Sequence, residues 1–384
     1  MTSTQDSLDA RLMRRALQLA HQGRYLTAPN PRVGCVIAQP SQDPGQPLRI
    51  IGEGYHHQAG RPHAEREALA QCSEDPRGAT LYVNLEPCCH HGRTPPCTDA
   101  VLEAGIARVV AATLDPFDEV RGQGVALLRE RGVEVSVGVL EDEARFENRF
   151  FMHFHERGWP WTILKSAVSL DGKCATASGD SKWITSEAAR AHVHQSRSEV
   201  DAILAGIGTI LADDPTMTAR PESLGPDEFH QPLRVVLDPN LEIPLSSKLI
   251  ETRDQSPVWV FCSEGVPTEK IENLHQLDIR VSPVPCKQHM LDLPAVLGAL
   301  AADNVQSLWI EGGPRIHTAF LEAQLVNEAH IYIAPKLIGG SGAPSFFMGQ
   351  GAATMKEAQP MEHAHWQILG DDALLQGVLR RQLP

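Results

Sequence analysis

Apolar residues recur at helical spacing near the start of the chain, at Met13, Ala16, Leu17 and Ala20. Ser7, a residue type that caps the amino terminus of a helix, precedes them. Gly23, a residue type that ends helices, follows them. The pattern predicts a first helix between Ser7 and Gly23.

Short apolar runs then alternate with helical stretches as far as residue 158. We predict strands at residues 33–38, 50–54, 80–85, 107–112 and 134–139, and helices at 63–72, 98–104 and 142–156. Gly158 and Pro160 follow the last of these helices and indicate a domain boundary. Strands that alternate with helices are typical of an α/β sandwich with a partly parallel sheet.

A second series of apolar runs follows the boundary. We predict strands at residues 161–169, 202–205, 233–237, 258–262, 279–284, 308–310 and 329–333. Two stretches rich in turn-forming residues, 39–48 and 221–232, are predicted to be surface loops. Since 384 residues exceed what one core usually covers, we expect two α/β domains, at residues 1–157 and 158–384.

Composition narrows the class of protein. Apolar residues make up 42% of the chain and charged residues 21%, the balance of a globular protein. No apolar run approaches the roughly 18 residues of a membrane span, so we expect no membrane association. The first seven residues are polar and do not resemble a signal segment, which predicts a cytoplasmic protein.

The charge balance bears on possible partners. The 34 basic and 48 acidic residues leave a net charge of −14, the wrong sign for following a phosphate backbone. We therefore expect no nucleic-acid partner. A small phosphorylated substrate is compatible with this charge, because a few arginines in one pocket can hold a single phosphate.

Cysteines are concentrated near the start of the chain, where five of the eight lie in the first hundred residues. In a reducing compartment such a cluster favours metal binding or catalysis over disulfides. A hydrolytic zinc site takes three protein ligands and keeps a fourth position for water, and two cysteines with one histidine are an accepted set. We predict zinc ligation by His63, Cys88 and Cys97.

Glu65 lies two residues after the predicted histidine ligand. Pro62 suits the first position of a helix, so we expect His63 and Glu65 to project together from a helix end, with Glu65 free of the metal. Zinc lowers the pKa of its water to about 7, and a nearby free carboxylate moves protons to the departing amine. We also expect the amino terminus of a helix to hold Cys97 as a thiolate.

The spacing of the cysteines departs from the usual deaminase signature, which closes as Cys-x-x-Cys. Here Cys97 follows Cys88 by nine positions, so Cys89, His90 and His91 are rival ligands. Two other functions remain open from the residues alone. The chain could be a nucleoside or tRNA deaminase with an unrelated second domain, or a binding protein whose metal is structural and has four protein ligands.

The stretched motif resembles one branch of the cytidine-deaminase-like superfamily, the bifunctional riboflavin-biosynthesis deaminase/reductases. In the first half the matches are Pro29-Asn30-Pro31-Arg32-Val33-Gly34, Gly54-Tyr55-His56, His63-Ala64-Glu65 and the run from Pro87-Cys88 to Pro95-Pro96-Cys97. Cys89 stands where a serine is common. Since the family's first ligand cysteine follows Glu-Pro, the resemblance assigns that role to Cys88.

The second half carries further matches to the same family. They are Lys165-Ser166-Ala167-Val168-Ser169-Leu170-Asp171-Gly172-Lys173, Ser181-Lys182-Trp183-Ile184-Thr185-Ser186, Thr209 with Leu211-Ala212-Asp213-Asp214-Pro215, and Glu311-Gly312-Gly313. The resemblance implies a cytidine-deaminase-like α/β/α sandwich followed by a dihydrofolate-reductase-like α/β domain. A homo-oligomer is the common default for such enzymes.

The resemblance also implies the reactions and the cofactors, zinc and NADPH. The first domain would deaminate 2,5-diamino-6-(5-phosphoribosylamino)pyrimidin-4(3H)-one to 5-amino-6-(5-phosphoribosylamino)uracil. The second would use NADPH to reduce the ribosyl chain of that product to ribityl. Its substrate is thus a phosphorylated pyrimidine.

Site residues follow from the resemblance position by position. It implies that NADPH contacts Ala167, Trp183, Thr209, Asp213 and the segment from Gly313. It implies that substrate contacts Asn30, Ser181, Arg197, Met217, Arg220 and Glu311. Arg197 and Arg220 suit a phosphate fork, and Lys165 and Glu311 are candidates for handling protons. Pro239 stands where some relatives have a serine, so no side-chain contact to the cofactor is expected there.

Overall fold

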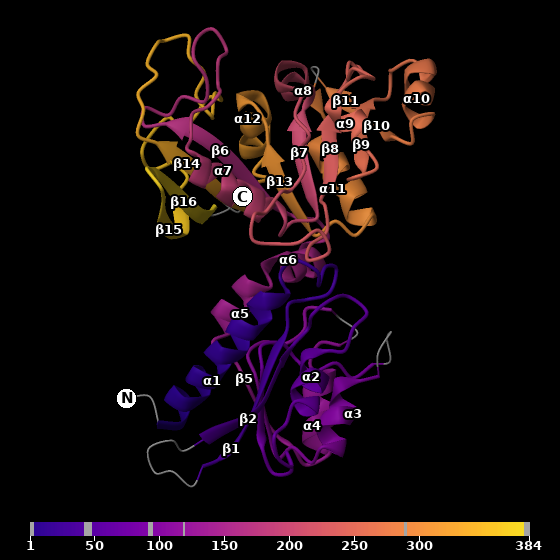
Figure 1. Cartoon of the computed structure of the whole chain (residues 1–384), viewed down its shortest axis with the longest axis vertical. Helices are drawn as coiled ribbons and strands as arrows, with labels where there is room; N and C mark the ends of the chain where they lie inside the picture. Colours follow the sequence, from indigo (N-terminus) through magenta and orange to yellow (C-terminus); the bar gives the residue numbers. More distant parts are fainter. Residues whose placement is uncertain (1–3, 42–47, 91–94, 118–119, 288–289, 380–384) are drawn as a thin grey trace. The chain divides into compact units, whose positions relative to one another are not determined.

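The computed structural model describes residues 4–41, 48–90, 95–117, 120–287 and 290–379. Its chain divides into two compact units, Met1–Gly158 and Trp159–Pro384, drawn in Figure 1. The division falls one residue after the expected boundary. No helix in the described part of the chain combines the length and apolar character needed to cross a membrane.

The amino-terminal unit is built on a five-stranded sheet in the order β2-β1-β3-β4-β5. The strands are β1 (Gly34–Pro40), β2 (Leu48–Tyr55), β3 (Thr80–Val83), β4 (Arg108–Ala111) and β5 (Glu134–Val137). Strand β1 runs antiparallel to β2 and β3, whereas β3, β4 and β5 are parallel. The partly parallel sheet expected from the alternating pattern is therefore present.

Helices cover both faces of this sheet (Figure 1). They are α1 (Thr4–Ala20), the short 3₁₀ helix η1 (His21–Gly23), α2 (Ala64–Ala70), α3 (Cys97–Glu103), α4 (Gln123–Glu130), α5 (Glu141–Glu147) and α6 (Arg149–Arg157). Cys35 and Ile37 of β1 pack with α2, α3 and α4, while the alternate residues Val36 and Ala38 pack with α1 and α5. This alternation of buried side chains produces the expected α/β/α sandwich.

The helix predicted over residues 142–156 is wrong in one respect, because Asn148 divides it into α5 and α6. The buried Asn148 side chain accepts a hydrogen bond from Arg32 N at 2.7 Å and donates one to Arg32 O at 2.9 Å. These bonds satisfy the backbone of a residue far away in the sequence. The first helix also begins earlier than expected, at Thr4 rather than after Ser7.

The carboxy-terminal unit contains a nine-stranded sheet in the order β10-β9-β8-β7-β13-β6-β14-β16-β15. Its strands are β6 (Trp161–Ser169), β7 (Ala202–Gly206), β8 (Leu233–Leu237), β9 (Val258–Ser263), β10 (Arg280–Val284), β13 (Ser307–Glu311), β14 (Glu328–Ala334), β15 (Met361–Leu369) and β16 (Asp372–Leu379). A separate hairpin pairs β11 (Cys286–Lys287) with β12 (Met290–Leu291). The last two strands of the large sheet are antiparallel additions to a parallel sheet.

Helices pack on both faces of the large sheet. They are α7 (Glu187–Arg197), α8 (Ile207–Asp213), α9 (Lys248–Glu251), α10 (Thr268–His275), α11 (Leu293–Ala302) and α12 (Pro314–Glu322). Val193 of α7 packs on Tyr332, whereas α11 and α12 pack on the core around Leu164 and Ile310. Strand β13 lies between β6 and β7 in the sheet, although it follows both in sequence. Ligands of open α/β sheets bind at the carboxyl ends of strands at such crossover points.

Candidate active sites

Three side chains of the amino-terminal unit form a cluster with the spacing of metal ligands. His63 caps the amino terminus of α2, Cys88 follows β3, and Cys97 is the first residue of α3. His63 Nδ1 lies 3.5 Å from Cys88 Sγ and 3.3 Å from Cys97 Sγ, and all three donor atoms lie within 4.8 Å of one another. Since zinc binds nitrogen at about 2.0 Å and sulfur at about 2.3 Å in tetrahedral geometry, this donor set fits zinc.

Two of the three rival ligands, Cys89 and His90, are not part of the cluster. Within the described ranges, His63, Cys88 and Cys97 form the one group of three or more His, Cys, Asp or Glu side chains that meets this spacing, and Cys89 and His90 are not in it. His91 lies outside the described residues. Three protein ligands leave a fourth tetrahedral position for water, as a catalytic site requires.

The two cysteine thiols differ in acidity. Hydrogen bonds from the Cys97 thiol, His63 and the Cys97 backbone lower the pKa of Cys88 to about 4 despite its burial. The pKa of Cys97 is raised well above its usual range, because this thiol donates to Cys88 and is buried. Between the two hydrogen-bonded thiols the negative charge therefore favours Cys88. Because zinc binds cysteine as the thiolate, the expectation that a helix terminus holds Cys97 as the thiolate stays a prediction.

Glu65 lies beside the cluster without belonging to it. It is the second residue of α2 and only 3% exposed. Burial raises the pKa of this carboxyl, and the neighbouring Cys88 raises it further. Pro62 precedes the helix cap instead of occupying the first helical position, so α2 begins one residue later than expected. His63 and Glu65 still lie together, because a cap and a second helical residue both lie at the helix end.

Close packing fixes α2 on the sheet. A Cβ atom added to Gly52 would lie 2.4 Å from Ala68 O, and one added to Gly54 would lie 2.4 Å from Ala68 N. A side chain at either position would therefore push the helix away from β2. The absence of side chains at these two glycines lets α2 place His63 and Glu65 at the pocket.

The segment leading to Cys88 is held by a buried carboxylate. Glu86 is 3% exposed and accepts hydrogen bonds from the backbone amides of Asp115, Gly122 and Val125, at 3.2, 2.8 and 3.0 Å. These bonds tie the turn after β3 to the segment after β4 and to α4. Glu86 therefore anchors the chain two residues before Cys88.

Asn30, the predicted reader of the ring edge, lies in the loop before β1. Its Nδ2 atom is 3.1 Å from Nε2 of His56, a buried residue that directly follows β2. The His56 ring meets the His63 ring edge-on, with 5.4 Å between centroids. Asn30 and His56 are therefore adjacent to the metal ligands, and His56 is a residue to which the sequence assigned no role.

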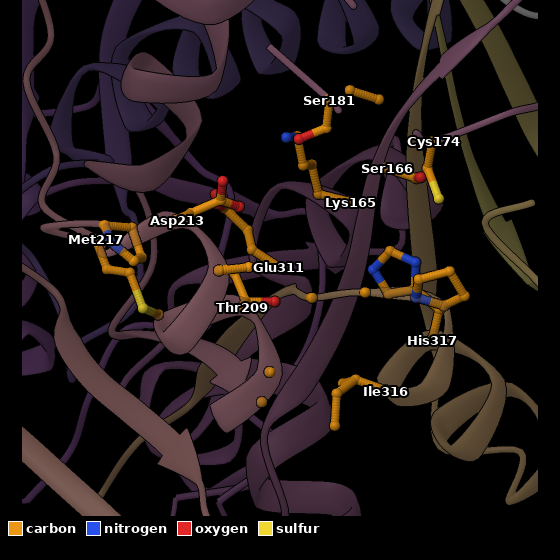
Figure 2. A pocket seen from close by; sticks show the side chains of 18 of the residues that line it. Lys165, Ser166, Cys174, Ser181, Thr209, Asp213, Met217, Glu311, Ile316 and His317 are labelled. Atoms are coloured by element: carbon orange, nitrogen blue, oxygen red, sulfur yellow. The ribbon is translucent and has the colours of Figure 1, made fainter. Parts of the chain in front are cut away.

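A cavity of about 1220 Å³ lies in the carboxy-terminal unit (Figure 2). Its walls come from the carboxyl ends of β6, β7 and β13 and from the first turns of α8 and α12. It brings together every residue predicted for the reductase site: Lys165, Ala167, Ser181, Trp183, Arg197, Thr209, Asp213, Met217, Arg220, Glu311 and Gly313.

Glu311 is held as a carboxylate at the end of β13. Arg197 donates to it through Nε at 2.7 Å and through Nη2 at 2.5 Å, and Trp309 Nε1 donates at 2.6 Å. Burial opposes ionisation, but the charge and hydrogen bonds of Arg197 outweigh it and lower the pKa of Glu311 to about 2. Because Glu311 is ionised across the physiological range, it is poorly suited to donate a proton.

Lys165 has the opposite character. Burial lowers the pKa of its ammonium group, while neighbouring Glu311 raises it and Arg197 lowers it. Its Nζ atom lies 5.9 Å from the centre of the Tyr332 ring, and no described residue forms a hydrogen bond with it. In Figure 2 the Lys165 side chain extends into the cavity from β6. A buried ammonium with a lowered pKa and no fixed partner can give up a proton.

Arg220 and His194 form a second polar group in the cavity. Arg220 Nη1 donates to Thr216 Oγ1 at 2.9 Å and to Thr218 Oγ1 at 2.6 Å, and Nη2 lies 3.1 Å from His194 Nε2. Burial and the charges of Arg197 and Arg220 lower the pKa of His194 to about 4. The neutral ring therefore accepts from Arg220. His194 lies one helical turn before the predicted residue Arg197 on α7. This spacing is the sequence signal that could have identified His194 as a cavity residue.

Two further cavity features were missed from the sequence. His317 of α12 is 2% exposed, and its Nε2 atom has no hydrogen-bond partner among the described residues. Lys182 Nζ lies 3.1 Å from Asp213 Oδ1, so the residue predicted to bind NADPH is paired with a lysine. Trp183, next to that lysine, is 65% exposed, and the Arg190 guanidinium lies 4.6 Å from its ring centre.

Two protein families match this chain. Residues 6–113 match the cytidine and deoxycytidylate deaminase zinc-binding region, and residues 160–375 match the RibD C-terminal domain. The riboflavin biosynthesis protein RibD of Bacillus amyloliquefaciens is 40% identical over 95% of both chains. That of Escherichia coli (strain K12) is 39% identical over 96% of this chain and 98% of its own.

Solved structures give the same result. Acinetobacter baumannii RibD, form 1, superposes with a TM-score of 0.86 at 35% identity, covering 98% of this chain and all of the other. The diaminohydroxyphosphoribosylaminopyrimidine deaminase/5-amino-6-(5-phosphoribosylamino)uracil reductase of Thermotoga maritima has a TM-score of 0.81 at 33% identity with the same coverage.

Proposed function

Because the chain belongs to the RibD family of bifunctional riboflavin-biosynthesis deaminase/reductases, we propose that its two units act in turn on one phosphorylated pyrimidine. The family has a cytidine-deaminase-like domain followed by a dihydrofolate-reductase-like domain. The first carries the zinc-binding site His63, Cys88 and Cys97, and the second is an NADPH-dependent reductase.

The proposed substrate follows from the name of the Thermotoga maritima protein. It is 2,5-diamino-6-(5-phosphoribosylamino)pyrimidin-4(3H)-one, which the amino-terminal unit deaminates to 5-amino-6-(5-phosphoribosylamino)uracil. The carboxy-terminal unit then reduces the ribosyl chain to ribityl. We assign deamination to residues 1–157 and reduction to residues 158–384.

Glu65 is the proposed general acid and base of deamination. Zinc held by His63, Cys88 and Cys97 supplies Lewis-acid activation of water at neutral pH. Glu65 takes a proton from the attacking water and delivers it to the departing amine, while Asn30 reads the ring edge. The observation that carries this assignment is the position of Glu65, which is buried against the cluster yet lies outside it.

Lys165 is the proposed proton donor of reduction. NADPH, held by residues such as Thr209 and Gly313, would supply the hydride for the sugar carbon that is bonded to nitrogen. The sugar oxygen released as the ring opens takes up one proton, and Lys165 provides it. Glu311 keeps Lys165 protonated until that step, because its own charge is fixed by Arg197. Lys165 and Glu311 thus receive different roles here, whereas the sequence made both of them candidates for handling protons.

The remaining cavity residues keep their proposed ligands. Ala167, Trp183, Thr209, Asp213 and Gly313 contact NADPH, and Ser181 and Met217 contact substrate. Arg197 is paired with the Glu311 carboxylate, whereas the hydrogen-bond partners of Arg220 are neutral. Arg220 is therefore the principal partner we propose for the substrate phosphate. A homo-oligomer and a cytoplasmic location stay predictions, to be measured by light scattering and by cell fractionation.

A two-step assay tests the proposed function. Purified protein given the diaminopyrimidine ribosyl phosphate should release one ammonia per substrate without NADPH. It should oxidise NADPH only when supplied with the deaminated product. Metal analysis of the same sample should give one zinc per chain. If zinc-loaded protein releases no ammonia, the deaminase assignment is wrong. If it oxidises NADPH with the undeaminated compound, the proposed order of the two reactions is wrong.

A further inference from the structure

We infer that His56 is a positioning residue of the deaminase site, which holds the Asn30 amide in one orientation and leaves Asn30 Oδ1 free to accept a hydrogen bond from the substrate ring. This inference rests on the proposed role of Asn30. It adds a residue that is not a zinc ligand and that acts on the substrate through Asn30.

The position of the proton on His56 follows from its partner. His56 Nδ1 lies 3.0 Å from the backbone carbonyl oxygen of Pro62. A carbonyl oxygen only accepts, so Nδ1 carries the hydrogen and donates it. In the neutral ring the other nitrogen, Nε2, then has a lone pair and no hydrogen. His56 is 2% exposed and its backbone N donates to Val33 O at 2.8 Å, so the ring has a fixed place.

The amide orientation of Asn30 follows from that lone pair. Asn30 Nδ2 lies 3.1 Å from His56 Nε2 and donates to it. The flipped amide would place the lone pairs of Oδ1 against the lone pair of Nε2, which is repulsive. Among the described residues, Asn30 Oδ1 accepts no hydrogen bond. The side chain therefore presents a free acceptor of known direction.

The backbone of Asn30 is also restrained. It lies between Pro29 and Pro31, and its N–H donates to Thr27 O at 2.7 Å. With the backbone fixed, rotation of the side-chain amide is the main freedom that remains. The hydrogen bond to His56 removes it. Pre-organised side chains lose less conformational freedom when a ligand binds.

The same hydrogen bonds connect ring recognition with the metal site. Pro62, whose carbonyl accepts from His56, directly precedes the zinc ligand His63. The His56 and His63 rings are in edge-to-face contact. Asn30 Oδ1 is thus placed relative to the zinc ligands through two hydrogen bonds. A fixed acceptor favours a ring edge that offers an N–H donor and disfavours one that offers a carbonyl oxygen.

A double-mutant cycle tests the inference in the full-length zinc enzyme. His56→Ala should raise the KM for ammonia release about tenfold, the scale of one neutral hydrogen bond, with kcat nearly unchanged. Asn30→Ala should raise KM at least as much. If His56 acts through Asn30, the double variant should match Asn30→Ala, because the second change removes nothing further. If KM in the double variant instead rises by the product of the two single-variant effects, the inference is wrong.

Two further variants separate positioning from folding. His56→Gln places an amide oxygen near the former Nε2 position and should recover part of the lost affinity. His57→Ala is the matched control, because the His57 ring packs at a tilt on Tyr55, with 3.9 Å between centroids, and among the described residues it forms no hydrogen bond with Asn30. It should leave KM unchanged. NADPH oxidation on the deaminated product serves as the activity control in every variant.

The outcomes distinguish this inference from the proposal beneath it. An Asn30→Ala enzyme with normal KM would remove Asn30 from substrate binding altogether. A raised KM in Asn30→Ala with a normal KM in His56→Ala would reject His56 alone. Loss of zinc in both His56→Ala and His56→Gln would show that His56 supports the loop of His63, and would also reject the inference.

Discussion

Each unit of this protein buries one glutamate beside its chemistry, and the two carboxyls are shifted in opposite directions. Burial raises the pKa of Glu65, and the opposing effect of the neighbouring His63 does not outweigh it. Glu311 is also largely enclosed, with 15% of its side chain exposed, yet Arg197 lowers its pKa to about 2. The same side chain is thus suited to carry a proton in one unit and a permanent charge in the other. The role of a buried carboxyl is set by its neighbours.

The largest expected effect is the loss of zinc, which the reaction of the amino-terminal unit needs and that of the carboxy-terminal unit does not. Cys97→Ala removes one of three donors, so zinc and deamination should both fall below detection. NADPH oxidation on the deaminated product should stay within about twofold of normal, because the cavity lies in the other unit. Metal analysis and the two assays on one preparation measure this. A large loss of reductase activity would show that the two sites are not independent.

The next prediction compares the same substitution, Glu to Gln, at Glu65 and at Glu311. Glu65→Gln keeps the size of the side chain but cannot carry a proton, so the kcat of deamination should fall by about 10² to 10⁴. Zinc should be retained, because Glu65 is outside the donor cluster. Glu311→Gln in the same assay should leave deamination normal. An active Glu65→Gln enzyme would remove this residue from the mechanism.

Acid should weaken the carboxy-terminal unit through Glu311. Its pKa is lower in the folded chain than the ordinary 4.5, so its charge stabilises the fold above about pH 4.5, and this stabilisation is lost as the pH falls toward 2. The loss should be on the order of 3 kcal/mol. All six tryptophans lie in this unit, so denaturant unfolding followed by tryptophan fluorescence reports it selectively. In Glu311→Gln this part of the pH dependence should disappear.

The smallest effect concerns Lys165. Glu311 raises the pKa of Lys165, so this pKa should be lower in Glu311→Gln. The alkaline limb of the reductase pH profile should therefore move to lower pH, and the loss of activity should be larger at high pH than at low pH. The Glu65→Gln enzyme provides the control profile, which should match the wild type. An unshifted limb would mean that the group titrating there is not Lys165.

The two sites also differ in how far the sequence predicted them. The zinc site could be predicted because few residue types bind zinc, and its three ligands lie between residues 63 and 97. The cavity residues came from the family resemblance alone. The bond between Arg197 and Glu311 joins residues 114 positions apart, and no local pattern indicates such a pair. His56 was part of a family match but received no role, because a buried histidine has no sequence pattern that indicates its partners.

The fold shows the same limit. All strands of the five-stranded sheet and the parallel strands β6 to β10, β13 and β14 were predicted, whereas β15 and β16 were missed. Strand β15 is exposed over most of its length at the sheet edge, so it lacks a buried apolar pattern. The break at Asn148 was missed because its cause is the backbone of Arg32, which lies on another part of the chain. The local periodicity of the sequence does not reveal hydrogen bonds between distant residues.

The zinc donors and the cavity walls come from stretches of chain that do not overlap, and this has a genetic consequence. Two defective alleles, one encoding Glu65→Gln and the other an altered Lys165, each keep one intact half. Expressed together in a riboflavin auxotroph, they should restore growth in trans, since the deaminated compound released by one protein can be reduced by the other. Complementation between alleles would then map any new mutation to its half.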